Sequence, residues 1–402
     1  MTDAAGVLAS NTALADRRFE MVLRNRVVFG VGSSETVPEF LVLSKPSRVF
    51  IVTDPGVRRA GIVDPIVHGL RALRLPTDVF DEVEPNPAAT TVERGAEQLR
   101  AFGTDGAIVV AIGGGSAMDA AKAIDLRAMN DRPIWELEYD GPDLTPGRPI
   151  IAVPTTAGTG SEAHSFAVIT REEIGRKDYI GHPSLLPIRT VLDPGLTVGL
   201  PPAVTAATGI DAMTHSLESL LSRIPNPFAE AMALAVIRAV SAWLEPAVAD
   251  GSSLEARSQL LVASHLAGVG QASGTGVGLV HALGHAIGTR GKLPHGTALA
   301  VVLPEVLSFY LGVRDRELSL VGEALGVASR AESDATGAVA AIGAIRAFCG
   351  RVGQRPSLRS LGFDEGLLDA VAQDAVDDAA IRNSPRLPTY EEARAILATR
   401  LD

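Results

Sequence analysis

The sequence predicts a two-domain protein, with an α/β N-terminal domain built on a Rossmann-like parallel sheet and an all-α C-terminal domain. Short apolar runs alternate with amphipathic stretches as far as Pro194, and almost no strand pattern follows. Such alternation is typical of a parallel sheet covered by helices on both faces. We place the boundary at residue 198, so the predicted domains are 1–198 and 199–402. Because no long linker joins them, we expect the two halves to pack directly, with a ligand-binding cleft between them.

Each element follows from its own local pattern. Four apolar runs have the length of strands and end at turn-forming Gly, Pro or Asp residues; they are 49–53, 107–112, 149–153 and 189–192. Helical apolar spacing marks 57–73, 91–102 and 117–128 in the first half. In the second half the same spacing marks 203–221, 227–247, 254–272 and 335–350.

Composition excludes some classes of function. The net charge of −11 repels phosphate backbones, so we expect no nucleic-acid partner. The lone cysteine, Cys349, cannot form an internal disulfide, fits a reducing compartment, and is interpreted as a small buried apolar residue. Residues 1–18 lack a leader pattern, and the longest apolar candidate for a membrane span, 297–312, is broken by Pro304 and Glu305. We therefore expect a soluble, cytoplasmic protein.

Two glycine-containing turns follow predicted strands. The first, Gly113-Gly114-Gly115-Ser116, opens a helix, whose N-terminal N–H groups suit a diphosphate. It departs from the G-x-G-x-x-G motif, because Asp119 stands near the place of the last glycine. The alternative interpretation is a tight strand–helix turn that binds no ligand. The second turn, 154–162, is rich in hydroxyls and could bind phosphate or ribose, or be a surface loop. Two such turns at the carboxyl ends of strands favour a nucleotide site. A third, 30–33, is interpreted as a strand-end turn.

Asp54 follows the 49–53 strand. A carboxylate there can accept hydrogen bonds from an adenosine ribose and repels a 2′-phosphate, which favours NAD over NADP. The alternative is an ordinary turn aspartate in Asp-Pro-Gly.

Histidines concentrate in the helical half. Asp211 and His215 are four residues apart in a predicted helix, as are His281 and His285, and His295 follows at a helix start. Spacing i,i+4 places two side chains on one helix face, where they can share a cation. One carboxylate with imidazoles suits Fe(II), Zn(II), Mn(II) or Co(II). The spacing leaves open which three of the four histidines bind. His265, on an apolar helix, is interpreted as a core residue.

Taken together, these motifs resemble the iron-containing (group III) alcohol dehydrogenase family over nearly the whole chain. The resemblance rests on segments 84–87, 113–119, 154–162, 193–194, 209–215 and 281–296. It implies a dehydroquinate synthase-like architecture, with an N-terminal dinucleotide-binding domain. It also implies the metal ligands Asp211, His215, His281 and His295, and a non-ligand active-site residue, His285. The cofactor residues it implies are Asp54, Gly114, Gly115, Ser116, Asp119, Thr155, Thr156, Thr159 and Lys177. In place of the family's usual Val-Thr the chain has Ala163-His164, so an imidazole stands where a hydroxyl approaches the cofactor.

The resemblance implies hydride transfer between NAD(H) and a primary alcohol, diol or hydroxyacid, or the corresponding aldehyde or ketone. We expect NAD and Fe(II), or Zn(II), as cofactors, and a homo-oligomer, most simply a homodimer. Two alternatives are a transhydrogenase with tightly bound NAD(H) and a dehydroquinate synthase-like lyase. The lyase needs several Lys and Arg, whereas segments 209–216 and 281–296 offer only Arg290 and Lys292. A metallohydrolase would leave the glycine turn without a role. A non-enzymatic scaffold would leave the ligand set without one.

Overall fold

The computed structural model describes residue 19 and residues 25–402, apart from 139–142 and 174. The segment 1–18, where we expect no leader, lies outside the described residues. The chain divides into two compact units, one ending at Gly199 and the other beginning at Leu200. The domain limits 1–198 and 199–402 include residues outside the described part and stay a prediction.

The first unit is built on a six-stranded sheet in which every paired strand is parallel, in the order β1-β8-β5-β4-β2-β3. Its strands are β1 Arg26–Phe29, β2 Arg48–Val52, β3 Thr77–Phe80, β4 Ala107–Gly113, β5 Ile150–Pro154 and β8 Arg189–Leu192. The predicted parallel sheet is confirmed, with all four predicted strands in it. The two that the sequence pattern missed, β1 and β3, are short edge strands with little burial, so they lack a continuous apolar run.

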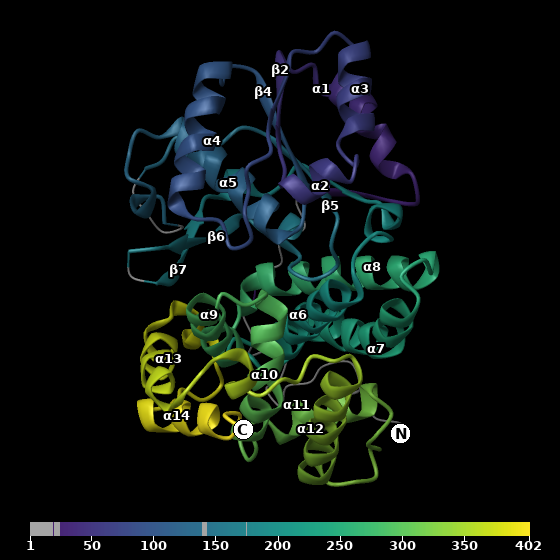
Figure 1. The fold of residues 1–402 in the computed structure, drawn as a ribbon. Helices are drawn as coiled ribbons and strands as arrows, with labels where there is room; N and C mark the ends of the chain where they lie inside the picture. The colour runs from purple at the N-terminus through teal and green to yellow at the C-terminus, as the bar shows by residue number, and fades with distance from the viewer. Residues whose placement is uncertain (1–18, 20–24, 139–142, 174) are drawn as a thin grey trace. The chain divides into compact units, whose positions relative to one another are not determined.

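Alternate residues of the central strands face two separate cores. Phe50, Val52 and Val109 belong to one core, with α4 Ala89–Phe102 and α5 Gly115–Met129. Val49, Ile51 and Val110 belong to the other, with α1 Val37–Ser44 and α3 Asp64–Ala72. Figure 1 shows these two pairs of helices on opposite faces of the sheet. Burial of both faces is the reason why the inner strands are apolar without alternation.

Two local features differ from the sequence prediction. The helix expected over 57–73 is two helices, α2 Pro55–Arg59 and α3, because Gly61 takes a left-handed conformation (φ 74°) between them. An antiparallel hairpin, β6 Phe166–Arg171 and β7 Arg176–Gly181, was not predicted. It packs on α5 through Ala167, Ile169 and Ile180.

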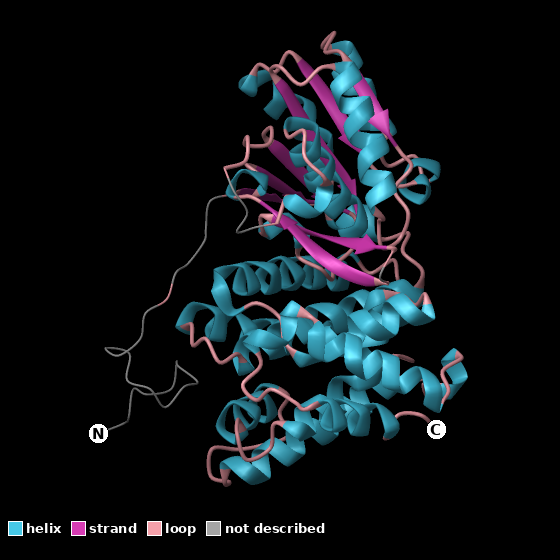
Figure 2. Cartoon of the chain, turned by 90° about the vertical axis from the view of Figure 1, so that its left-hand side faces the viewer, coloured by secondary structure: helices cyan, strands magenta, loops and turns pink. Residues whose placement is uncertain are grey.

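The second unit contains no strand among its described residues (Figure 2). Its helices are α6 Pro202–Leu221, α7 Pro227–Ala249, α8 Leu254–Gly270, α9 Leu279–Gly291, α10 His295–Phe309, α11 Asp315–Ala324, α12 Asp334–Arg351, α13 Glu365–Asp377 and α14 Tyr390–Ala398. Helix α6 packs against α7, α8 and α10 and is buried at nearly every position from Thr205 onward. The all-helical prediction is confirmed.

Helix α7 is the one described helix long and apolar enough to cross a membrane by length and composition, with a mean hydropathy of 1.5 over 18 residues. It is longer than the 297–312 segment that the sequence singled out. It packs between α6 and α8 and buries Val236, Val240 and Leu244. Of the 18-residue window, 33% is buried, so α7 also has a face that is not buried. On α12, Cys349 is fully buried and unpaired, and burial raises the pKa of its thiol to about 12.

Candidate functional site

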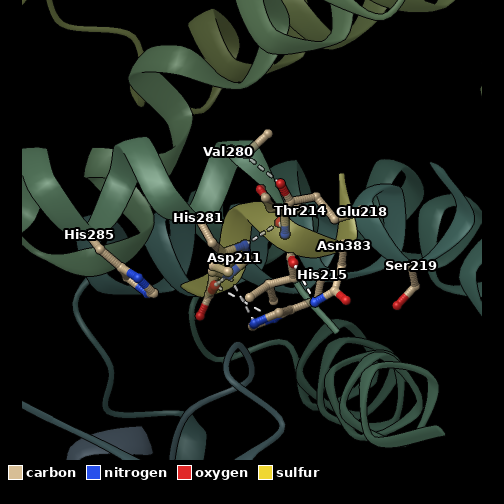
Figure 3. A network of polar contacts seen from close by, with 12 residues as sticks. Asp211, Thr214, His215, Glu218, Ser219, Val280, His281, His285 and Asn383 are labelled. Carbon is tan, nitrogen blue, oxygen red and sulfur yellow. Dashed lines mark hydrogen bonds and ion pairs between the residues drawn. The ribbon is translucent and has the colours of Figure 1, made fainter. Parts of the chain in front are cut away.

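Three helices of the second unit bring the predicted ligand residues together (Figure 3). Asp211 and His215 lie one turn apart on α6, His281 and His285 one turn apart on α9, and His295 is the first residue of α10. Among the described residues, one group of ionisable side chains could hold a metal ion: Asp211, His281 and His295 each offer a ligand atom within 4.8 Å of the others. His215 adjoins it, with its Nε2 3.1 Å from Nε2 of His281.

Oδ1 of Asp211 is the centre of this cluster. Nδ1 of His215 and Nε2 of His295 both lie 3.6 Å from it, and Nε2 of His281 lies 3.8 Å away. This buried oxygen accepts no hydrogen bond. In a tetrahedral site with bonds of about 2.0–2.1 Å, ligand atoms lie about 3.4 Å apart. A buried carboxylate oxygen ringed by imidazoles just beyond hydrogen-bond range therefore fits a shared divalent cation, and the donor set suits Fe(II) or Zn(II).

The ionisable groups of the cluster shift one another's pKa values. Burial alone would raise the pKa of Asp211, but the three imidazoles outweigh it and hold that pKa far below its usual value. Burial alone would lower the pKa of His281, but the carboxylates of Glu218 and Asp211 raise it to about 9. A cation bound at this site would therefore have to displace a proton from His281.

A glycine allows α10 to begin close against α6. A Cβ on Gly296 would lie 1.9 Å from the carbonyl oxygen of Ala207, a backbone atom of α6. Only a residue without a side chain can occupy this place, directly after His295. The Pro-His-Gly sequence thus sets the distance between His295 and the α6 residue Asp211.

His285 lies beside the cluster without joining it. Its ring stacks near that of His295, with centroids 5.4 Å apart. Nδ1 of His285 donates to Oδ2 of Asp378 at 2.8 Å, and both side chains are buried. Burial would raise the pKa of Asp378, but His285 outweighs burial and lowers it. A histidine whose orientation is fixed by a carboxylate can transfer protons through its other nitrogen.

Sequence reasoning missed two of these carboxylates. Glu218 accepts a hydrogen bond from Nδ1 of His281, and a signal existed, since Asp211, His215 and Glu218 repeat at i, i+4 and i+7 on one helix face. Asp378 lies more than 90 positions after His285, between α13 and the 3-10 helix Ala379–Asn383, and no local pattern marks it.

In the first unit, the two glycine turns lie against each other. A Cβ on Gly114 would be 3.2 Å from Cγ2 of Thr156, and one on Gly115 would be 2.5 Å from Cγ2 of Thr159. The adjacent strands β4 and β5 explain this approach, because the turns follow their carboxyl ends. Thr155 is buried, and its N–H donates to the Gly113 carbonyl. The N-terminal end of α5 and the second turn are therefore side by side, and such a helix end suits an anionic group.

Asp119 is engaged within the protein. Its Oδ1 accepts from Oγ of Ser161 and its Oδ2 from the N–H of Val168, so it ties α5 to the second turn and to β6. Burial raises its pKa even though Lys122 lies close. The Nζ of Lys122, also buried, donates to the carbonyl and hydroxyl of Ser161 and lies 3.3 Å from Nδ1 of His164. His164 stacks on Phe166, with ring centroids 3.7 Å apart.

Two more of the predicted cofactor residues, Ser116 and Lys177, contact Asn86. Its N–H donates to Oγ of Ser116, and its Oδ1 accepts from Nζ of Lys177 at 2.9 Å. Asn86 takes a left-handed conformation (φ 56°), which allows both contacts. Asp54 uses Oδ1 to cap α2 through the N–H groups of Gly56 and Val57. Its Oδ2 lies 3.2 Å from the position a Cβ of Gly113 would take.

Comparisons with known proteins match both units of the chain to one family. The sequence profile of iron-containing alcohol dehydrogenases matches residues 24–194, and that of the C-terminal domain of the same family matches 205–401. The chain is 38% identical to a probable alcohol dehydrogenase, EutG, of Salmonella typhimurium, over 86% of this chain and 85% of that protein. It is 35% identical to 1,3-propanediol dehydrogenase of Klebsiella pneumoniae, over 94% of this chain and 98% of the other.

Solved structures show the same fold. A 1,3-propanediol oxidoreductase superposes with a TM-score of 0.91 at 35% identity, covering 96% of this chain and all of the other. A sulfoacetaldehyde reductase from Bifidobacterium kashiwanohense in complex with NAD+ superposes with a TM-score of 0.85 at 25% identity, covering 96% and 99%. The chain belongs to the iron-containing alcohol dehydrogenase family and is an oxidoreductase that interconverts alcohols and aldehydes.

Proposed function

We propose that this alcohol dehydrogenase is NAD(H)-linked and holds a divalent metal, Fe(II) or alternatively Zn(II), on Asp211, His215, His281 and His295. The observation that carries the ligand assignment is Oδ1 of Asp211, which is buried, accepts no hydrogen bond and has three imidazole nitrogens 3.6–3.8 Å away. In a metal-free chain, such a carboxylate has desolvation costs without matching hydrogen bonds. A cation among these atoms would compensate its charge.

A metal at this site supplies Lewis-acid chemistry, stabilising the oxygen of the alcohol or aldehyde. His285 is the proposed proton-transfer residue. Asp378 holds the proton on Nδ1 of His285, and we assign proton exchange with the substrate or with solvent to Nε2. The charge of a protonated His285 lowers the pKa of Asp378, which favours the ion pair in which Asp378 accepts the Nδ1 proton.

The proposed NAD site is the pair of glycine turns. Gly114, Gly115 and Ser116 would hold the diphosphate at the start of α5, facing Thr155, Thr156 and Thr159. Lys177 and Asp54 would contact the riboses, and Asp119 would act by holding the second turn. NAD+ is bound in the related sulfoacetaldehyde reductase, which supports the choice of dinucleotide. The Oδ2 atom of Asp54, which accepts no bond in the cap of α2, supports NAD over NADP.

The proposed substrates are small primary alcohols, diols or hydroxyacids and their aldehydes or ketones. The relatives named for 1,3-propanediol support this range. We further propose that the enzyme is a homo-oligomer, most simply a dimer, and is cytoplasmic. A single cysteine supports the reducing compartment. Light scattering of the purified protein tests the oligomer.

The test is anaerobic aldehyde reduction with NADH over a panel of small aldehydes. Protein stripped of metal is assayed alone and after Fe(II) or Zn(II) is added back, beside His281→Ala as the ligand variant. We expect activity to return with one metal in the wild type and not in His281→Ala, which should bind no metal. A His281→Ala variant with full metal content contradicts the ligand assignment. Equal activity of the stripped and reloaded wild type contradicts metal dependence.

A further inference from the structure

Glu218 and Asp211 lie at opposite nitrogens of His281, and Glu218 is not in the group of side chains that could hold an ion. It is on α6, one turn after His215, and only 5% of its surface is exposed. Figure 3 shows its carboxylate between the α6 backbone and the start of α9, next to His281 and Val280. A charge at this depth needs donors around it.

Three donors surround the carboxylate, all from one turn of chain. The N–H of Gly278 donates to Oε2 at 2.8 Å, and the N–H of Val280 donates to Oε1 at 2.6 Å. Nδ1 of His281 donates to Oε2 at 2.5 Å. Gly278 is the N-cap residue of α9 and has no capping side chain of its own, so Glu218 caps α9 from a neighbouring helix.

The contact with His281 decides which of its nitrogens faces the cluster. Because the carboxylate accepts from Nδ1, a proton is held on Nδ1, and Nε2 is the nitrogen that would give up its proton to bind a cation. That Nε2 points toward Oδ1 of Asp211, 3.8 Å away. The contact is close, since a Cβ on Gly278 would lie 3.0 Å from Oγ of Ser384 and 3.1 Å from Oε1 of Glu218.

We propose that Glu218 is the positioning residue of the metal centre: it fixes the tautomer and orientation of His281 and joins the first turn of α9 to α6. One carboxylate thus holds a proposed ligand and caps the helix that carries it. This inference rests on the ligand set proposed above. A carboxylate behind a ligating histidine typically changes metal affinity by about 10- to 100-fold.

The test compares Glu218→Gln with two other variants. Glutamine keeps the size of the side chain but has one acceptor oxygen and no charge, so it cannot accept from Val280 at the Oε1 position and from Gly278 and His281 at the Oε2 position at once. Glu230→Gln is the matched control, because Glu230 is a glutamate of α7 in the same unit with 3% exposure. His281→Gln removes the ligand itself. Zn(II) affinity of the metal-free proteins is measured by competition with a chelator, and Co(II) absorption reports the coordination geometry.

We expect Glu218→Gln to fold, to bind Zn(II) about 10- to 100-fold more weakly, and to shift the Co(II) spectrum. Glu230→Gln should bind as the wild type does. If Glu218→Gln binds within twofold of wild type while His281→Gln does not bind, Glu218 is only a helix cap and the inference is overturned. If His281→Gln also binds like the wild type, the proposed ligand set fails as well.

A measurement on the wild type covers the case in which Glu218→Gln does not fold. In Zn(II)-loaded protein labelled with 15N at histidine, the imidazole signal that disappears in His281→Gln belongs to His281. We expect that signal to show a proton on Nδ1 and a metal-bound Nε2. A proton on Nε2 overturns the inference.

Discussion

Gly296 offers a test of how closely the helix positions control the metal centre. We predict that Gly296→Ala weakens metal binding, although the new methyl group touches no ligand. Its Cβ would lie 1.9 Å from the carbonyl oxygen of Ala207, whereas ordinary contact begins at 3.4 Å. The start of α10 must therefore move away from α6 by about 1.5 Å, because the oxygen is a backbone atom of α6 and the Cβ is fixed to the backbone of α10.

That movement is large on the scale of a metal site. Ligand distances tolerate about 0.2 Å, so His295, next to the substitution, would no longer share a cation with Asp211. Losing one of four ligands should lower Zn(II) affinity by at least about tenfold, which corresponds to about 1.4 kcal/mol. Overpacking should also lower the free energy of unfolding by about 1–3 kcal/mol.

The assay is chelator competition for Zn(II), together with thermal unfolding of the metal-free protein. Gly343→Ala is the control. Gly343 is an exposed residue of α12 with nothing within 4 Å of its Cβ position, so alanine should stabilise this helix by about 0.5–1 kcal/mol and leave affinity unchanged. Gly296→Ala protein with wild-type affinity and melting temperature would refute the reasoning.

Three further predictions follow from other parts of the chain. His285→Ala should keep full metal content and lose about 10²–10⁴-fold in kcat, since it removes only a proton-transfer group; loss of metal from the variant argues against this role. Asp54→Ser keeps an oxygen to cap α2 and removes the charge, so the ratio of kcat/KM for NADPH over NADH should rise by about tenfold or more, and an unchanged ratio speaks against Asp54 as the discriminator. Burial raises the pKa of Asp125 to about 7, and Arg148 offsets this only partly. Between about pH 4 and 7, the carboxyl of Asp125 is therefore protonated in the folded state and ionised in the unfolded state. The contribution of Asp125 to stability is therefore lost as pH rises through 7, and Asp125→Asn should gain up to about 4 kcal/mol over wild type at pH 8 but little at pH 4; a pH-independent difference in denaturation midpoints would exclude this explanation.

Most of the α/β unit could be predicted because its strands are buried on both faces. Continuous apolar runs such as 107–112 are visible without any tertiary information. The edge strands β1 and β3 and the hairpin of β6 and β7 lack such runs, since they are only partly buried and owe their pairing to neighbours far away in sequence. The helix expected over 57–73 failed for a local reason, the left-handed turn at Gly61.

By itself, the sequence determined which chemistry the chain carries. An aspartate and a histidine at helical spacing, two more histidines four apart and a third before Gly296 specify a carboxylate-imidazole site, and two glycine turns after strands specify a nucleotide site. Local spacing could not show which histidines bind the metal, because His215 and His285 each lie four residues after another candidate ligand.

Only the tertiary structure decided which side chains meet. It places Asp211 among imidazoles from three helices and pairs His285 with Asp378, while Glu218 lies behind His281. These pairs join residues 63 to 93 positions apart, and such contacts depend on how the helices pack. Spacing along a chain can set the residues of one helix face, but the partners across a helix interface follow from the side chains and glycines that determine how close two helices come.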